Sequence, residues 1–296
     1  MTEHNYIEFK KKRELGDILS DTFAFMRNEF KPFFNVFFKI VGPFLAAMLV
    51  ALVLYMWFAA DVINANSSLM INSTRSAGLL EWGVSLFYGV SLLTVYAMSQ
   101  STVLHYIKSY TNGKGSIDFE TIRRDVYASF WSFIGMIFLV AICLVVGFML
   151  CCIPGIYLWV PLSLAFSIMV FDQMGVGDAF GESFKLVKDH WFITFATLLV
   201  MGIIVGIASY AFALPTAIYN LVRTGLMSGE FDAESIANIN RDPVAILLSL
   251  IGTVAQFMLN IITLVAGAFI YFNLNEHKNF TGTYERIQNL GKTPEN

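Results

Sequence analysis

The chain has 296 residues, of which only 14% are charged, whereas an ordinary soluble protein carries about 25%. Apolar residue types make up 56% and include 28 phenylalanines, and a water-soluble fold of this length cannot hide so much apolar surface behind so few charges. The net charge of −3 also excludes an overall basic surface for nucleic acid. We therefore predict an integral membrane protein.

Segments long enough to cross a bilayer recur along the chain, since a spanning helix needs about 20 largely apolar residues. In chain order they are Val41–Ala60, Trp82–Leu104, 130–153, 156–171, Phe192–Val222 and Pro243–Asn275. The third and fourth come from one uncharged stretch, which Pro154-Gly155 divides by a predicted turn. Because hydrocarbon leaves backbone groups without partners and the runs lack the alternation of barrel strands, we predict an all-α protein with six transmembrane helices.

Basic residues are distributed unequally between the connections. Sixteen of the 19 Lys and Arg residues precede span 1, join spans 2–3 or 4–5, or follow span 6, and the other three are Arg75, Arg223 and Arg241. Lysine and arginine accumulate on the cytoplasmic side of membrane proteins. This distribution predicts that both termini are cytoplasmic, in a protein of the inner or plasma membrane.

An internal repeat precedes two of the spans. Leu15–Phe23 and Val176–Phe184 lie 161 residues apart, and both place apolar or small residues at i, i+3, i+4 and i+7. We expect each to form an amphipathic helix in the cytoplasmic interface, turning at Phe30 or Trp191 into the following span. A weaker third copy, Phe119–Phe130, precedes span 3.

The repeat predicts one membrane domain, residues 1–296, built from three units of interfacial helix plus helical hairpin. The units are 14–104, 116–171 and 176–275, followed by a cytoplasmic tail, 276–296. Parallel repeats occur in transporters. The simpler explanation is duplication of a stable folding unit in which the amphipathic helices brace the hairpins.

Several motifs resemble a known family. Pro154–Tyr157, the span ending Met169–Asp172, and Gly175–Phe180 look like the membrane domain of the glycerophosphodiester phosphodiesterases and its stand-alone multi-pass relatives. Leu15–Leu19 is similar to that family's N-terminal segment, so that the resemblance covers most of residues 13–200. It implies a multi-helix membrane domain. The family's hydrolytic activity belongs to a separate soluble barrel, and no soluble segment here is long enough to form one.

Uncharged polar residues inside the spans form the candidate site. Gln100 lies near the inner end of span 2, while Gln256, Asn260 and Thr263 follow at i, i+4 and i+7 on one face of span 6. Amides at this depth are expected to point into the bundle. They either line a polar cavity or form hydrogen bonds between helices.

A basic run formed by Lys10, Lys11, Lys12 and Arg13 precedes the first amphipathic helix. Each positive charge close to anionic lipid is worth about 1 kcal/mol. We expect these four residues to contact the inner leaflet, and a docking site for a cytoplasmic partner is the alternative.

Catalytic chemistry has little support in the sequence. The interiors of spans 2 to 6 hold no ionisable residue, which disfavours a proton-coupled pump. A rim site from His105, Asp172 and His190 is conceivable, although scattered interfacial histidines explain the same pattern. Metalloprotease, phosphate-loop and GxSxG motifs do not occur. We expect no catalytic residue, metal or cofactor.

The functional expectation is therefore a non-enzymatic polytopic membrane protein. It would be an accessory or scaffold protein whose partners are membrane lipids or another membrane protein, and not nucleic acid. The first alternative is a transporter or flippase for an amphiphilic or uncharged solute. The second is a lipid-modifying enzyme at the cytoplasmic rim.

Overall fold

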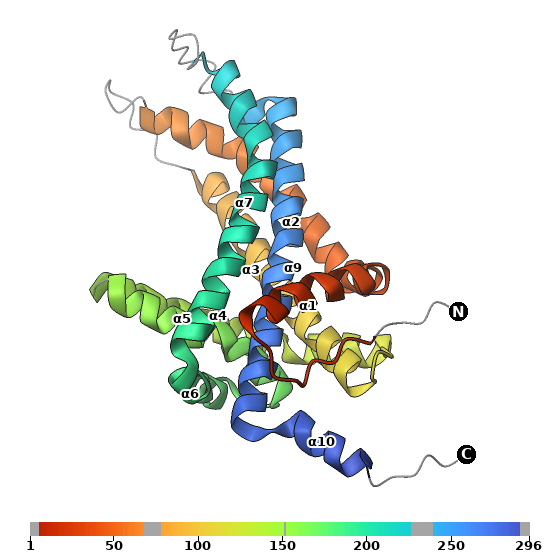
Figure 1. Cartoon of the computed structure of the whole chain (residues 1–296). Helices are drawn as coiled ribbons and strands as arrows, with labels where there is room; N and C mark the ends of the chain where they lie inside the picture. The colour runs from red at the N-terminus through yellow and green to blue at the C-terminus, as the bar shows by residue number, and fades with distance from the viewer. Residues whose placement is uncertain (1–5, 68–77, 151, 226–238, 291–296) are drawn as a thin grey trace. The chain divides into compact units, whose positions relative to one another are not determined.

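The structure is a computed structural model that describes residues 6–67, 78–150, 152–225 and 239–290 (Figure 1). Every regular element in these ranges is helical. The α-helices are α1 (Leu15–Asn28), α2 (Phe30–Ser67), α3 (Leu79–Asn112), α4 (Phe119–Leu150), α5 (Cys152–Phe171), α6 (Val176–Val187), α7 (Trp191–Arg223), α9 (Pro243–Asn279) and α10 (Thr281–Leu290). Short 3₁₀ turns cover Lys188–His190 and Ile239–Arg241.

Six candidate membrane spans lie among the described residues, in α2, α3, α4, α5, α7 and α9. Each contains a window that is long and apolar enough to cross a bilayer. The prediction of an all-helical, multi-pass membrane protein with six spans is thereby confirmed. The spanning helices are longer than the uncharged runs, because α2 already begins at Phe30 and α9 continues to Asn279.

The chain forms two compact units. Unit 1 comprises Met1–Ile40, Ala97–Ile204 and Ile261–Asn296, and unit 2 comprises Val41–Tyr96 and Val205–Asn260. The boundaries fall within α2, α3, α7 and α9 rather than between the three predicted helix–hairpin repeats.

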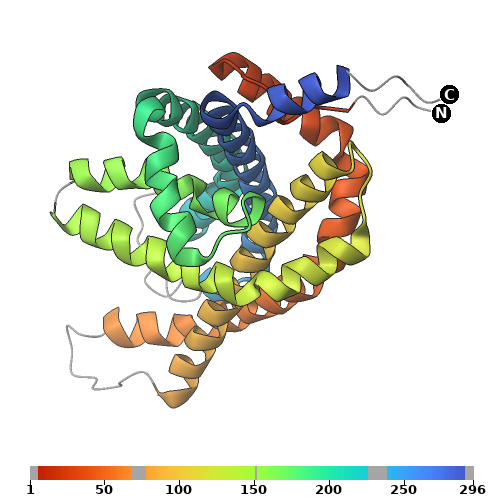
Figure 2. The same ribbon diagram turned by 90° about the horizontal axis from the view of Figure 1, so that it is seen from below.

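Aromatic side chains fill the core of unit 1. Phe9 stacks on Phe269 with ring centroids 4.2 Å apart, and Phe25 meets Phe9 and Tyr110 edge to face at 5.3 and 5.2 Å. Pairs of this kind add about 0.5–1.5 kcal/mol each beyond the area they bury. They join the N-terminal segment, α1, α3 and α9, and Figure 2 shows α10 beside the segment that leads into α1.

The two repeated segments form separate helices that end where the periodicity predicts. Helix α1 ends at Asn28 before α2 begins at Phe30, and α6 ends at Val187, shortly before α7 begins at Trp191. Part of each apolar face packs inside unit 1. The buried residues are Ile18, Thr22 and Phe25 of α1, and Ala179, Ser183, Leu186 and Val187 of α6.

The third repeat differs from the expectation. Helix α4 runs without a break from Phe119 to Leu150, so that the weak third copy forms the first turns of a long helix. Arg123 interrupts the apolar stripe of this copy, and nothing in the sequence between Phe119 and Phe130 ends a helix. Only two separate amphipathic helices therefore precede spans in the described residues.

Prolines break the helices less than predicted. Helix α5 begins at Cys152, which places Pro154 in its first turn, where a missing N–H leaves no helical hydrogen bond unmade. Pro215 lies inside α7, which continues to Arg223. Within the predicted tail, residues 281–290 form α10.

Candidate functional site

A groove of about 720 Å³ lies within unit 2, between α3, α7 and α9. Apolar and small residues form most of its wall, including Leu92, Ala213 and Phe257. The predicted Gln256 and Asn260 both line it. The structure thus brings two of the four predicted intramembrane polar residues to one groove.

Three amides in the groove retain hydrogen-bonding capacity. Neither the Gln256 nor the Asn260 amide hydrogen-bonds to another group in the described part of the chain, and the buried Oδ1 of Asn220 accepts no hydrogen bond there. The hydroxyls of Ser209 and Thr253 instead donate to carbonyls of their own helices, each at 2.8 Å. The amides, together with the hydroxyls of Thr216 and Ser249, are therefore the groups to which a ligand can hydrogen-bond.

The other two predicted residues belong to unit 1. Gln100 is buried, at 2% exposure, and its Oε1 accepts no hydrogen bond from any described group. Thr263 is half-buried on α9. Neither lines the groove.

The opposite face of α9 is wholly apolar. A second groove, of about 510 Å³, is lined by side chains of α7 and α9 within unit 2 and contains no polar residue in its lining. Its residues from Leu250 to Leu259 are offset by about half a turn from Ser249, Thr253 and Asn260 of the first groove. Along α9, the polar residues of unit 2 thus lie on the side of the first groove.

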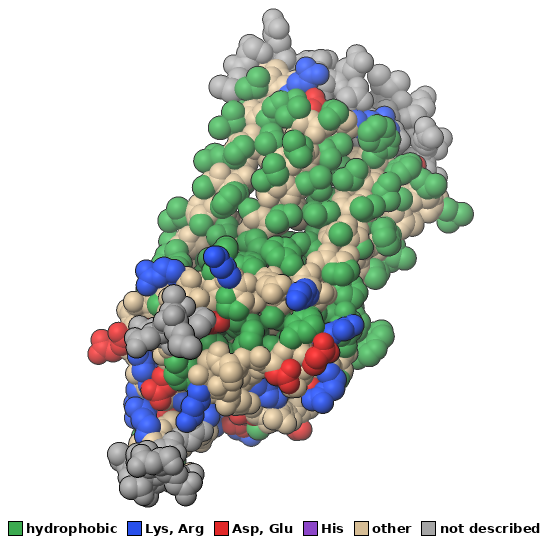
Figure 3. Space-filling model, turned by 90° about the vertical axis from the view of Figure 1, so that its right-hand side faces the viewer, with side chains coloured by type: hydrophobic (Ala, Val, Ile, Leu, Met, Phe, Trp, Pro, Cys, Tyr) green, Lys and Arg blue, Asp and Glu red, His purple; other side chains and the backbone are tan. Residues whose placement is uncertain are grey.

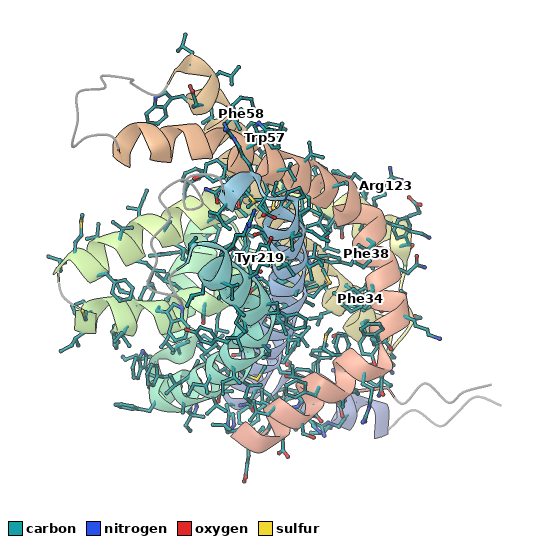
Figure 4. All side chains as sticks on the ribbon, turned by 90° about the horizontal axis from the view of Figure 1, so that it is seen from above. Phe34, Phe38, Trp57, Phe58, Arg123 and Tyr219 are labelled. Atoms are coloured by element: carbon teal, nitrogen blue, oxygen red, sulfur yellow. The ribbon has the colours of Figure 1, made fainter. Side chains whose placement is uncertain are left out.

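Hydrogen bonds fasten α7 to the start of α9. The hydroxyl of Tyr219, labelled on α7 in Figure 4, lies 3.0 Å from both carboxylate oxygens of Asp242, and Arg223 pairs with the same carboxylate at 3.4 Å. These contacts hold the neighbouring Asn220 in place at one end of the groove. Sequence reasoning missed Asn220, although Ser209, Ala213, Thr216, Ala217 and Asn220 form a small and polar stripe at helical spacing.

In unit 1, Arg13 and the three lysines of the basic run have different roles. The Arg13 side chain is fully buried; its Nε donates to Asp21 at 2.8 Å, and its guanidinium lies 4.7 Å from the Phe269 ring centroid. Burial lowers the pKa of Arg13 although Asp21 opposes the shift. Burial alone would raise the pKa of Asp21, but the hydrogen bonds and charges of Arg13 and Lys11 bring it below its ordinary value. Arg13 therefore holds the N-terminal segment in the fold.

Lys10 and Lys12 contact α10 or the residue before it, whereas Lys11 pairs with Asp21 of α1. Lys12 is exposed, with its Nζ 4.4 Å from the Phe280 ring centroid, and the carbonyl of Lys10 accepts a hydrogen bond from Arg286. Tyr284 and Ile287 are exposed on α10, and Phe280, which directly precedes it, is exposed as well. We call this surface the terminal face; it comprises Lys10, Lys11, Lys12, Phe280, Tyr284 and Ile287.

Glu276 fixes the start of α10. Its buried carboxylate accepts hydrogen bonds from the backbone N–H of Gly282 at 2.7 Å and of Thr283 at 2.9 Å. Such acceptors satisfy the open N–H groups of a helix N-terminus. Gly282 lies so close to the Lys10 carbonyl that a side chain would collide with it. The N-terminal segment and α10 thus pack closely against each other.

The rim residues do not converge on a metal. His105 Nδ1 lies 2.8 Å from the Ser101 carbonyl, Asp172 accepts from Tyr271 at 2.6 Å, and the His190 ring faces His277 at 5.1 Å. Burial raises the pKa of Asp172 against the lowering effect of the Tyr271 hydrogen bond. Among the described residues no three His, Cys, Asp or Glu side chains are grouped to hold a metal ion.

No protein-family model, curated protein or solved structure matches this chain. The fold itself defines the class, a multi-pass α-helical membrane protein. Its candidate sites are the groove of unit 2 and the terminal face of unit 1.

Proposed function

We propose that the protein is a non-enzymatic, multi-pass protein of the inner or plasma membrane that acts as an accessory or scaffold protein for lipid or a membrane partner. The terminal face carries this proposal, because the exposed Lys12 and the half-buried Lys10 and Lys11 lie there with exposed apolar and aromatic side chains. The headgroup region of a bilayer accommodates this combination. Figure 3 shows that charged side chains gather over part of the visible surface while hydrophobic ones cover most of the rest.

The charge distribution supports cytoplasmic termini, since sixteen of 19 basic residues lie on the same predicted side. An interfacial position for α1 is supported by Phe23, which is 42% exposed at the edge of its packed face, and by Phe30, the first residue of α2, which is 57% exposed. The resemblance to the glycerophosphodiester phosphodiesterase membrane domain stays part of this proposal. A rim enzyme gains no support, because His105, Asp172 and His190 have separate partners.

Replacing the three lysines tests the lipid-binding role. Lys10→Gln/Lys11→Gln/Lys12→Gln should weaken binding of phosphatidylglycerol to the purified protein about tenfold or more, since each charge is worth about 1 kcal/mol near anionic lipid. Native mass spectrometry of delipidated protein titrated with this lipid measures the effect. Arg223→Gln is the control and should change little, because Arg223 lies in unit 2 and pairs with Asp242. Unchanged phosphatidylglycerol binding by the triple variant would contradict the role of the terminal face.

A second candidate function is transport or flipping of an amphiphilic or uncharged solute. The observation that favours it is the groove of unit 2, which reaches Gln256 and Asn260. Uncharged amides along the groove can hydrogen-bond to a polar headgroup that crosses the hydrocarbon. Transport of this kind needs no proton relay.

A vesicle assay tests this candidate. Wild-type protein in phosphatidylcholine vesicles that contain a fluorescent lipid should raise the fraction that dithionite reaches from outside. Gln256→Leu/Asn260→Leu should remove most of the increase, because no polar group then lines the inner part of the path on α9. Wild-type vesicles that behave like protein-free vesicles would eliminate transport of this lipid and leave the accessory role standing.

A further inference from the structure

We propose that the groove between α3, α7 and α9 is a binding site for an uncharged amphiphile, a molecule with a long apolar chain and a headgroup that carries hydroxyl or amide groups. This site lies in unit 2 and is separate from the terminal face. It therefore goes beyond the accessory role and stands or falls independently of it. It shares its groove with the second candidate function, transport, but concerns binding, which is tested without any movement of lipid across the membrane.

The amides without hydrogen-bond partners indicate which polar groups the ligand carries. Asn220 places a buried, unpartnered Oδ1 in the groove wall, and Gln256 and Asn260 add amides that bond to no other described group. A polar group without a partner is costly in hydrocarbon. A hydroxyl or amide on a ligand can hydrogen-bond to the amides of Gln256 or Asn260, and a second polar group of the ligand, at the other end of the groove, can donate to the Asn220 oxygen.

The lining also specifies the charge of the ligand. None of the residues that line this groove is Lys, Arg, His, Asp or Glu. A phosphate or carboxylate placed there would be desolvated without a compensating cation, which disfavours an anionic lipid. The site therefore selects an uncharged headgroup, in contrast to the basic terminal face.

The dimensions suit a membrane lipid. The lining of α9 runs from Ser249 to Asn260, about 16 Å at 1.5 Å per residue, or roughly half of a 30 Å hydrocarbon core. The volume of about 720 Å³ lies within the range of small-molecule sites. One lipid of a single leaflet fits this length, with its chain against Leu92, Ala213 and Phe257.

The second groove serves as an internal comparison. It uses the same two helices, and its lining holds no polar residue, so that ordinary acyl chains can fill it. Polar residues that only join helices would have hydrogen-bond partners on the neighbouring helices, whereas the Gln256 and Asn260 amides bond to no other described group. Amides without partners therefore occur in the groove on the α3 side and not in the apolar groove, which indicates a ligand with polar groups for the first groove alone.

A lipid titration tests the proposal. Delipidated wild-type protein is titrated with dioleoylglycerol, and native mass spectrometry should show one molecule bound per chain that dioleoyl phosphatidylglycerol does not displace. Gln256→Leu/Asn260→Leu should weaken diacylglycerol binding about tenfold or more, since two hydrogen bonds are lost. The same variant should bind phosphatidylglycerol like the wild type, because that lipid belongs to the terminal face.

Two further variants serve as a control and as a second test of the polar groove. Met258→Leu changes the apolar groove and should leave diacylglycerol binding unaltered, whereas Ala217→Leu fills the polar groove from α7 and should reduce it even if the double variant fails to fold. The proposal is overturned if wild-type protein binds no diacylglycerol or if phosphatidylglycerol displaces it. It is also overturned if the double variant loses thermal stability while binding diacylglycerol normally, because the amides would then only join helices.

Discussion

Arg13→Met is expected to lower the free energy of unfolding by about 3–5 kcal/mol, the usual result of removing one partner from a buried ion pair. The Arg13 side chain is fully buried, and it donates both to Asp21 and, at 2.6 Å, to the Phe9 carbonyl. Methionine fills a similar volume but leaves both acceptors without this donor. Thermal unfolding of the detergent-solubilised protein, followed by circular dichroism, measures the loss.

Lys11→Met is the matched control, because Lys11 also pairs with Asp21, at 3.3 Å, but its side chain is 43% exposed. An exposed pair of this kind contributes about 0–1 kcal/mol. Equal destabilisation by the two variants would contradict the assignment of Arg13 as the buried link.

The same pair predicts a dependence on acid. The pKa of Asp21 is lowered in the folded chain, so the carboxylate contributes stability above its ordinary pKa of about 4, and this contribution disappears as the pH falls through the lowered value. Wild-type protein should therefore lose stability below about pH 4. Arg13→Met should show a smaller loss over this range, since the largest source of the lowered pKa is absent.

Most of the membrane architecture follows from local sequence. Uncharged runs locate all six spans because length and apolarity alone decide whether a helix can cross hydrocarbon. Helical periodicity also predicts α1 and α6 and their ends before Phe30 and Trp191. The division into two units is not predictable in this way, because it depends on contacts between segments far apart in the chain.

The candidate sites were only partly predictable. The i, i+4 spacing places Gln256 and Asn260 on one face, but Gln100 follows Tyr96 by one turn of α3 and already belongs to unit 1. The position of an amide along its span therefore does not predict whether it lines the same groove as the amides of other spans. Likewise, four consecutive basic residues look equivalent in sequence, and only the aromatic core and Asp21 single out Arg13.

Glycine shows the same dependence on tertiary context. Gly202 and Gly206 form the GxxxG pattern that indicates close helix packing, yet a methyl group added at either would meet nothing within 4 Å. The close approach occurs in the α4–α5 hairpin instead. A methyl group at Gly155 would lie 2.5–2.7 Å from the Phe148 ring, and one at Gly147 would lie 3.2 Å from the Gly155 Cα.

Gly155→Leu is therefore expected to lower the free energy of unfolding by about 3 kcal/mol, at the upper end for an overpacked core, because the facing backbones of α4 and α5 cannot separate without losing their other contacts. Gly202→Leu, on an exposed face of α7, should change stability by about 0.5 kcal/mol or less. Thermal unfolding of both variants in the same detergent gives the comparison. If Gly202→Leu proved the more damaging, the close packing would lie on the face of α7 that carries the GxxxG pattern, and the hairpin would tolerate a side chain at its glycine.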